Sequence, residues 1–282
     1  MTKYGMVIDV DRCIGCYLCF LACRDEHAGN DNPPIAAAQP DAGQKWIDVR
    51  EHERGALPRV KVDYVPVPCL HCSDAPCIGA GTGGAVYRRP DGIVVIDPEK
   101  AVGQRDIVAG CPYRVVFWNE ERNVAQKCTF CAHLLDDGWR EPRCVEACPT
   151  QAIVFGNLAD KTSEIAKLRE SQPVEEFMPE FKTRPLVGYL GLPKRFVTGE
   201  IVLADKPDLP AEGVEVALED GAGRRVVKTD NYGDFEFDSL DPKARYKLRI
   251  QHPGYAEREI ALSSRMDLDV GAVVLDPAAA RR

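Results

Sequence analysis

The spacing of the cysteines constrains this chain more than any other feature. The sequence has 282 residues and twelve cysteines, and all of the cysteines lie between Cys13 and Cys148. They form three runs and one isolated position, which are Cys13, Cys16, Cys19 and Cys23; Cys69, Cys72 and Cys77; Cys111; and Cys128, Cys131, Cys144 and Cys148. Thiols at such short, regular steps predict a region that folds around metal.

The first run has the ligand spacing of iron–sulfur cubanes. In that pattern three cysteines at steps of three hold one [4Fe-4S] cluster, and a fourth a few residues later belongs to a second cluster. Six disulfides would suit a short, loop-rich secreted chain better than this one. Zinc would explain the pairs Cys128-x2-Cys131 and Cys144-x3-Cys148, but not three cysteines in succession. We therefore predict an electron-carrying iron–sulfur protein.

Two histidines close to cysteines raise a further alternative. A Rieske centre needs a Cys-x-His and a Cys-x-x-His element. The pairs Cys69-x-His71 and Cys131-x-His133 supply only the first of these. We expect these histidines to lie near the clusters or at the surface rather than to bind iron.

Charge and hydropathy restrict the classes of partner and the cellular location that we expect. The 44 acidic residues outnumber the 36 basic ones, which disfavours nucleic acid as a partner. No apolar run approaches the roughly 18 residues of a membrane span. Residues 1–10 lack a secretory signal pattern, so we expect a cytoplasmic location. Export in a complex with a partner that carries the signal is left open.

The pattern along the chain predicts three parts. Residues 1–155 form the cluster domain, with short strands near 4–10, 92–96 and 115–118. Within it, residues 24–68 are expected to be an insertion, either a solvated charged loop or a partner contact. Residues 156–195 read as a connector, with a helix that Asp160 or Thr162 caps and that ends near Glu170.

Residues 196–282 alternate between polar and apolar positions, as β-strands do. Seven short strands predict an immunoglobulin-like β-sandwich, at 196–203, 214–218, 225–228, 235–237, 246–250, 257–262 and 272–275. The turn and strand at 229–237 resemble the carboxypeptidase-regulatory-like and transthyretin-like modules. No cluster of histidine, cysteine or nucleophile lies in this part, so interaction or surface coverage is the expected role. The fold class is therefore α+β, a ferredoxin-like multi-cluster domain followed by an all-β sandwich.

The sequence also carries the trace of a missing cluster. Applying the spacing of the first run to the second and third runs places further ligands at 81, 101, 104 and 107, where the chain has Gly81, Ala101, Gln104 and Ile107. If these runs once shared two clusters, the four losses remove one of them. The cysteines then left to hold the other are Cys69, Cys72, Cys77 and Cys111. Twelve thiols thus make three [4Fe-4S] clusters with none left over, and restored cysteines are expected to rebuild a fourth site only if packing has not closed over it.

These runs resemble the small iron–sulfur subunit of molybdenum enzymes in the dimethyl sulfoxide reductase family. The loss of one cluster and the added sandwich are similar to one branch, the small subunit of pyrogallol–phloroglucinol transhydroxylase and related hydroxybenzene enzymes. We match to that branch the segments Asp25-Glu26-His27, Glu53-Arg54-Gly55, Gln126-Lys127-Cys128-Thr129 and 131–137. Arg24 departs from the pattern, because such runs often have proline after the fourth cysteine.

The resemblance implies how the remaining thiols pair. It assigns Cys13, Cys16, Cys19 and Cys148 to one cluster, and it assigns Cys128, Cys131, Cys144 and Cys23 to another. It also implies a large molybdopterin-containing catalytic subunit as partner, in an αβ heterodimer or its multimer.

No catalytic residue is expected in this chain. It has no phosphate-binding loop, and the glycines at 79–84 lack the strand and helix that a dinucleotide fingerprint needs. The leading expectation is an electron-transfer subunit of an enzyme acting on hydroxylated aromatics, with an external electron carrier as a further partner. Alternatives are a structural or electron-buffering subunit of a redox-neutral transhydroxylase, a subunit of another molybdenum reductase, and a stand-alone carrier.

Overall fold

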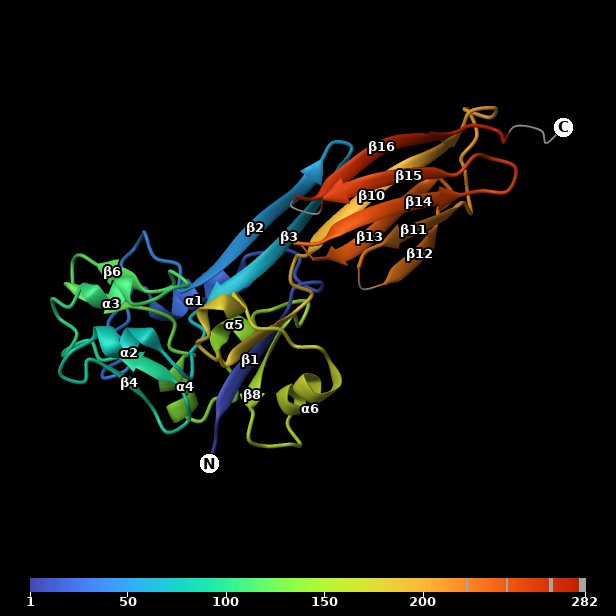
Figure 1. The fold of residues 1–282 in the computed structure, drawn as a ribbon. Helices are drawn as coiled ribbons and strands as arrows, with labels where there is room; N and C mark the ends of the chain where they lie inside the picture. The colour runs from blue at the N-terminus through green and yellow to red at the C-terminus, as the bar shows by residue number, and fades with distance from the viewer. Residues whose placement is uncertain (222, 242, 264–265, 279–282) are drawn as a thin grey trace. The chain divides into compact units, whose positions relative to one another are not determined.

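A computed structural model describes residues 1–221, 223–241, 243–263 and 266–278, so the last four residues of the expected sandwich lie outside it (Figure 1). The chain divides into two compact units. The first comprises Met1–Glu51 and Asp63–Leu192, and the second comprises His52–Val62 and Pro193–Arg282. Segments distant in sequence thus fold together in both units.

The first unit is built on a three-stranded sheet. Its central strand β1 (Tyr4–Asp9) pairs antiparallel with β8 (Ile153–Asn157) and parallel with β9 (Val187–Leu190). The run Met6, Val7 and Ile8 is fully buried, as expected of a strand covered on both faces. This confirms the strand expected at the start of the chain, and it ties residues 153–190 to the cysteine region.

Short helices and two small hairpins also belong to this unit, and four cysteines lie within the helices, namely Cys19, Cys23, Cys77 and Cys144. The helices are α1 (Leu18–His27), α2 (Pro76–Ala80), α3 (Asp106–Ala109), α4 (Ala132–Asp136), α5 (Arg143–Glu146) and α6 (Glu164–Ser171), with the 3-10 turn η1 (Pro179–Phe181). Two small hairpins join β4 (Val86–Arg88) to β5 (Val94–Ile96) and β6 (Phe117–Asn119) to β7 (Val124–Gln126).

The cap of α6 differs from the prediction. Ser163 precedes the helix, and its Oγ accepts a hydrogen bond from the main-chain N–H of Ala166 at 3.3 Å. Asp160 instead accepts hydrogen bonds from Thr162. The predicted caps therefore lie three residues and one residue before the observed cap, and Asp160 instead stabilises the loop before the helix.

The expected loop within 24–68 is a β-hairpin over much of its length. Strands β2 (Ile47–Ala56) and β3 (Arg59–Pro68) pair with each other, and the hairpin tip, His52–Val62, belongs to the second unit. There the Arg54 guanidinium lies 5.4 Å and the Lys61 ammonium 4.7 Å from the ring centre of Phe196. Arg54 also lies 3.7 Å from a carboxylate oxygen of Asp267. Two basic side chains of the hairpin tip, Arg54 and Lys61, therefore have partners within the second unit.

In the described residues after Leu192, seven strands form two sheets, in agreement with the predicted number. One sheet has the order β13-β10-β16 and the other β12-β11-β14-β15. The strands are β10 (Arg195–Leu203), β11 (Glu215–Glu219), β12 (Arg224–Lys228), β13 (Asp234–Leu240), β14 (Arg245–Gln251), β15 (Arg258–Ser263) and β16 (Leu268–Leu275). Apolar side chains from both sheets form one core, so this unit is a sandwich with its own hydrophobic interior.

The sandwich core gives a first prediction. Leu248 on β14 is fully buried, so Leu248→Ala is expected to cost about 2–5 kcal/mol of unfolding free energy in the second unit. Hydrogen exchange of peptides from β11 and β14, measured across a denaturant series, checks this. Val226→Ala is the matched control, because Val226 on β12 is 46% exposed and its truncation is expected to change little. Equal effects of the two substitutions would contradict the assigned core.

Candidate iron–sulfur cluster sites

The first run of cysteines winds around the start of α1. Gly15 has a φ of +66°, and a Cβ at this position would lie 2.5 Å from Cδ1 of Tyr64. Glycine therefore permits both the left-handed turn and the close approach of that ring. Cys19 and Cys23 follow on the helix and are buried, whereas Cys16 is exposed.

A first cysteine group consists of Cys13, Cys16, Cys19 and Cys148. Burial raises the pKa of Cys19 to about 12, and the negative charges of the other three thiols raise it further. Burial likewise raises the pKa of Cys13, with contributions from Cys148 and Cys16. The Ala152 N–H donates to Cys148 Sγ at 3.3 Å. Four thiols from the two ends of the cysteine region thus come within electrostatic reach of one another.

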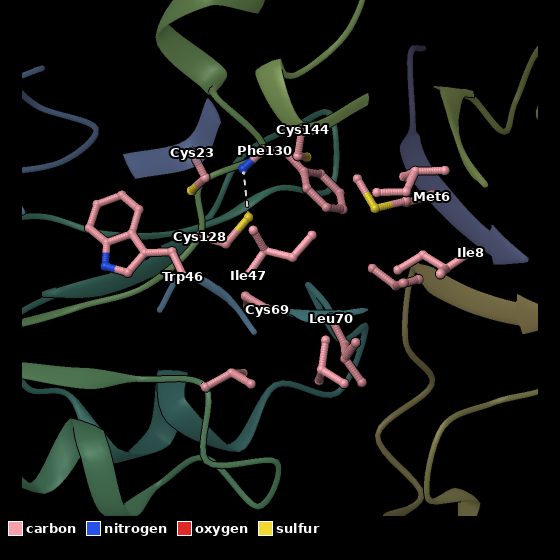
Figure 2. Packing of buried hydrophobic residues seen from close by; sticks show 14 of the residues in the cluster. Met6, Ile8, Cys23, Trp46, Ile47, Cys69, Leu70, Cys128, Phe130 and Cys144 are labelled. Atoms are coloured by element: carbon pink, nitrogen blue, oxygen red, sulfur yellow. Dashed lines mark hydrogen bonds between the residues drawn. The ribbon is translucent and has the colours of Figure 1, made fainter. Parts of the chain in front are cut away.

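A second cysteine group consists of Cys23, Cys128, Cys131 and Cys144. Burial raises the pKa of Cys144, and repulsion from the other three thiols adds to the effect. Figure 2 shows Cys23, Cys128 and Cys144 among apolar side chains of the core, with the Phe130 N–H donated to Cys128 Sγ at 3.4 Å. These thiols occupy core positions that a domain without a cofactor would fill with apolar side chains.

A third cysteine group consists of Cys69, Cys72, Cys77 and Cys111. All four line one cavity with an empty volume of ≈ 330 Å³, part of which is open to solvent. Burial raises the pKa of Cys72 to about 12 and that of Cys77 to about 11, and repulsion from Cys69 and Cys111 contributes to both shifts.

The three groups suit cubane clusters chemically. All twelve cysteines are free thiols, and most are buried close to others of the same potential charge. Such thiolates are stable only beside compensating positive charge, which cluster iron supplies. Among the described residues, no three His, Cys, Asp or Glu side chains are arranged to hold one metal ion. A cubane takes each thiolate on a different iron, so its ligands surround a cavity, as the third group does.

The groups also lie next to one another in a fixed order. Cys19 of the first group raises the pKa of Cys23 and Cys144 in the second. Cys69 of the third group is the largest charged influence on Cys128 of the second, and its main chain also hydrogen-bonds that thiol. The second group therefore lies between the other two along a path of neighbouring thiols.

Packed side chains occupy the places where the ligands of the missing cluster were expected. Ala101 and Ile107 are fully buried in a small apolar core that also contains Val86. A Cβ on Gly81 would lie 2.9 Å from Val86 Cγ2. Gln104 Oε1 accepts a hydrogen bond from the Thr82 N–H at 2.7 Å. Side-chain packing has thus taken the space that a cluster would need.

This packing makes a second prediction. A variant with cysteine at positions 81, 101, 104 and 107 is expected to bind no additional iron, because a closed apolar core offers no cavity for a cubane. Iron and acid-labile sulfide per chain, compared with the parent protein, provide the measurement. A gain of about four irons would show that the core opens.

Histidines lie close to the thiols, as expected for His71 and His133, and His27 joins them although no such place was expected for it from the sequence. The buried His27 Nε2 lies 3.7 Å from Cys131 Sγ, and burial lowers the pKa of this imidazole to about 3. His133 Nε2 bonds Glu26 Oε1 at 2.9 Å, so His133 is placed by a carboxylate. His71 is fully buried beside the third group. His27 was noted in the sequence only as part of the segment Asp25-Glu26-His27, so its position beside Cys131 was not predicted.

Arg24, the departure noted in the first run, has a structural role. Its guanidinium donates hydrogen bonds to Gln39 Oε1 at 3.1 Å and to the carbonyl oxygen of Pro40 at 2.8 Å. It also donates to the carbonyl oxygen of Asp41 at 2.6 Å. Arg24 therefore fixes the loop that follows α1.

Known protein families match both units. Residues 60–158, which contain the last eight cysteines, match the 4Fe-4S dicluster domain. Residues 197–275 match the carboxypeptidase regulatory-like domain. The chain thus combines a 4Fe-4S region with a strand-rich module, in line with the two-part fold expected from its sequence. No helix in the described residues is long and apolar enough to cross a membrane.

Relatives extend this likeness over the whole length. The pyrogallol hydroxytransferase small subunit of Pelobacter acidigallici is 41% identical over 98% of this chain and 100% of its own length. An iron–sulfur subunit of Halobacterium salinarum, assigned to a dimethyl sulfoxide reductase, is 36% identical over 67% of this chain and 79% of its own. A sulfite dehydrogenase subunit of Allochromatium vinosum is 30% identical, with 85% and 99% covered. This chain therefore belongs to the family of iron–sulfur small subunits of the dimethyl sulfoxide reductase type, which includes the pyrogallol hydroxytransferase small subunit.

Proposed function

We propose that this chain is the electron-transfer subunit of a molybdopterin-containing enzyme that acts on hydroxylated aromatics. The proposal includes three [4Fe-4S] clusters, one held by each cysteine group. When bound, each cluster takes up and releases one electron. The chain itself supplies the thiolates, the low-dielectric surroundings and the spacing between sites.

The observation that carries the proposal is the series of neighbouring thiol groups. Cys19 links the first group to the second, and Cys69 links the third group to the second. Groups in series, with an exposed thiol at Cys16 in the first and partly exposed Cys111 in the third, suit a path that crosses the unit. A single storage site would need only one such group.

The partner and the substrate class are proposed from the relatives. Several of them are named as one subunit of an enzyme, which supports a larger catalytic partner for this chain. The name of the Pelobacter relative includes pyrogallol, which supports a hydroxybenzene as substrate of that partner. We further infer an αβ assembly. We place it in the cytoplasm, because free thiols are kept reduced there.

A second role for the chain is favoured by the word hydroxytransferase in that name. A transfer of hydroxyl between two aromatics is redox-neutral overall and needs no external carrier. This chain would then be a structural subunit, or a store of electrons that brings the catalytic centre to its working oxidation state.

Electron paramagnetic resonance on the anaerobic native complex separates the two roles. Pyrogallol is added without any electron acceptor, and 1,2,3-trimethoxybenzene, which has no free hydroxyl, is the control. A reduced-cluster signal that only pyrogallol elicits supports the electron path. Product formation with unchanged clusters supports the redox-neutral role. The absence of both a reduced-cluster signal and a product would overturn the proposed substrate class.

A further inference from the structure

Lys127 places a positive charge inside the cluster unit. The side chain is 2% exposed, and its Nζ donates hydrogen bonds to the carbonyl oxygens of Val94 and of Cys128, the latter at 3.1 Å. In the part of the chain that the structure describes, both hydrogen-bond partners of the Lys127 ammonium are carbonyl oxygens and neither is a carboxylate. A buried ammonium is costly unless a negative charge compensates it, and two carbonyl dipoles do not supply one.

The negative charge within reach comes from two different cysteine groups. The Lys127 Nζ hydrogen-bonds the carbonyl oxygen of Val94, a residue that lines the cavity of the third group, and the carbonyl oxygen of Cys128 in the second group. An ammonium held by these two main-chain oxygens lies beside both groups. The negative charge that compensates the Lys127 ammonium therefore comes from both the second and the third group.

His71 lies beside the third group and has a ring nitrogen without a hydrogen-bond partner in the described residues. Its Nδ1 accepts the Val94 N–H at 3.0 Å, so this nitrogen carries no proton and the neutral ring carries its proton on Nε2. Nε2 is buried and has no hydrogen-bond partner in the described part of the chain. The ring centre lies 3.8 Å from that of Phe130, which restrains the ring. His71 lines the same cavity as the four thiols of the third group.

One residue orients both side chains. Val94 on β5 gives its N–H to His71 and its carbonyl oxygen to Lys127. Val94 is 1% exposed and also lines the cavity of the third group. The donor and the charge are thus held on one strand and cannot move independently of it.

We propose that Lys127 and His71 form a fixed electropositive bridge that raises the reduction potentials of the clusters in the second and third groups above that of the first. The Lys127 ammonium acts on both clusters, and the His71 Nε2–H donates to a sulfur of the third. Reduction adds one electron, and hence one negative charge, which a nearby cation and a donated hydrogen bond stabilise. This inference rests on the proposed function, namely that these groups hold clusters.

The test is a redox titration of the native complex, followed by electron paramagnetic resonance, with iron counted in every sample. Lys127→Gln removes the charge but keeps donors for the two carbonyls. It is expected to lower the potentials of the second and third clusters by at least a tenfold change in the ratio of oxidised to reduced form, about 59 mV for one electron. The first cluster is expected to keep its potential. Lys127→Arg is expected to restore all of them.

A matched control tests whether the position of the lost charge matters, and not only the loss of one positive charge. Lys100→Gln removes one positive charge from a side chain that is 57% exposed and pairs with Asp97, and it is expected to shift no cluster. His71→Phe is expected to lower the potential of the third cluster alone. Unchanged potentials in both bridge variants, or equal shifts of all three clusters, would overturn the proposal.

The outcomes also separate this inference from the function on which it rests. Parent protein without cluster iron would refute the proposed function, whereas intact clusters with unaltered potentials would refute only the bridge. If both bridge variants lose iron, the role of His71 is tested instead by pulsed electron paramagnetic resonance on the parent complex labelled with 15N-histidine. A histidine nitrogen coupled to the third cluster is expected, and its absence would refute the role of His71.

Discussion

Replacing Cys111 with serine is expected to remove one cluster and leave the other two in place. Cys111 shares its cavity with Cys69, Cys72 and Cys77, and no thiol of the first group lines that cavity. Loss of one ligand from a four-thiolate set leaves an iron incompletely bound in a site partly open to solvent. We expect the chain to lose about four irons, with the resonance of the third cluster missing.

The control for this substitution adds the same hydroxyl without removing a ligand. Ala75 lines the same cavity, so Ala75→Ser is expected to keep all of the iron. Equal loss from all three groups at an unchanged yield of folded protein would contradict the grouping. So would loss of the cluster assigned to the second group instead of the third.

Removal of all clusters is expected to unfold the first unit and to leave the sandwich folded. Six of the buried cysteines belong to the largest core of the first unit, so their clusters complete that core. The binding energy of such a cofactor is also folding energy. The core of the second unit contains no cysteine, so it does not depend on iron.

Hydrogen exchange of the full chain measures this difference. After oxidative removal of iron by a chelator, peptides from β1 and β8 are expected to exchange rapidly, whereas peptides from β11 and β14 keep their protection. The same chelator under anaerobic, reducing conditions is the control, because the clusters then stay bound. Persistent protection of β1 without iron would contradict the claim that clusters complete its core.

The parts of the structure that the sequence predicts are those set by local spacing. Steps of three residues predict that the cysteines are cubane ligands before any fold is known. Alternation in residues 196–275 predicts seven strands, and the described residues of this range contain seven, most of which bury one face in a single sandwich core. Both signals depend on neighbours along the chain.

The parts of the structure that the sequence does not predict depend on contacts between segments distant along the chain. The strand β2 was missed because Arg54 is stabilised by Phe196 and Asp267, which lie far along the chain from it. The closure of the fourth site depends on how Ile107 and Gly81 pack against Val86. Lys127 likewise looked like one residue of a motif, and its role follows only from its burial between two cysteine groups.

Integrated electron paramagnetic resonance of the fully reduced native complex tests the central claim most directly. Three cysteine groups that each hold one [4Fe-4S] cluster predict about three unpaired spins per chain, one from each reduced cluster. A total near two would mean that one group holds no cluster. A total near zero, with zinc in place of iron, would contradict the electron-transfer role of this subunit.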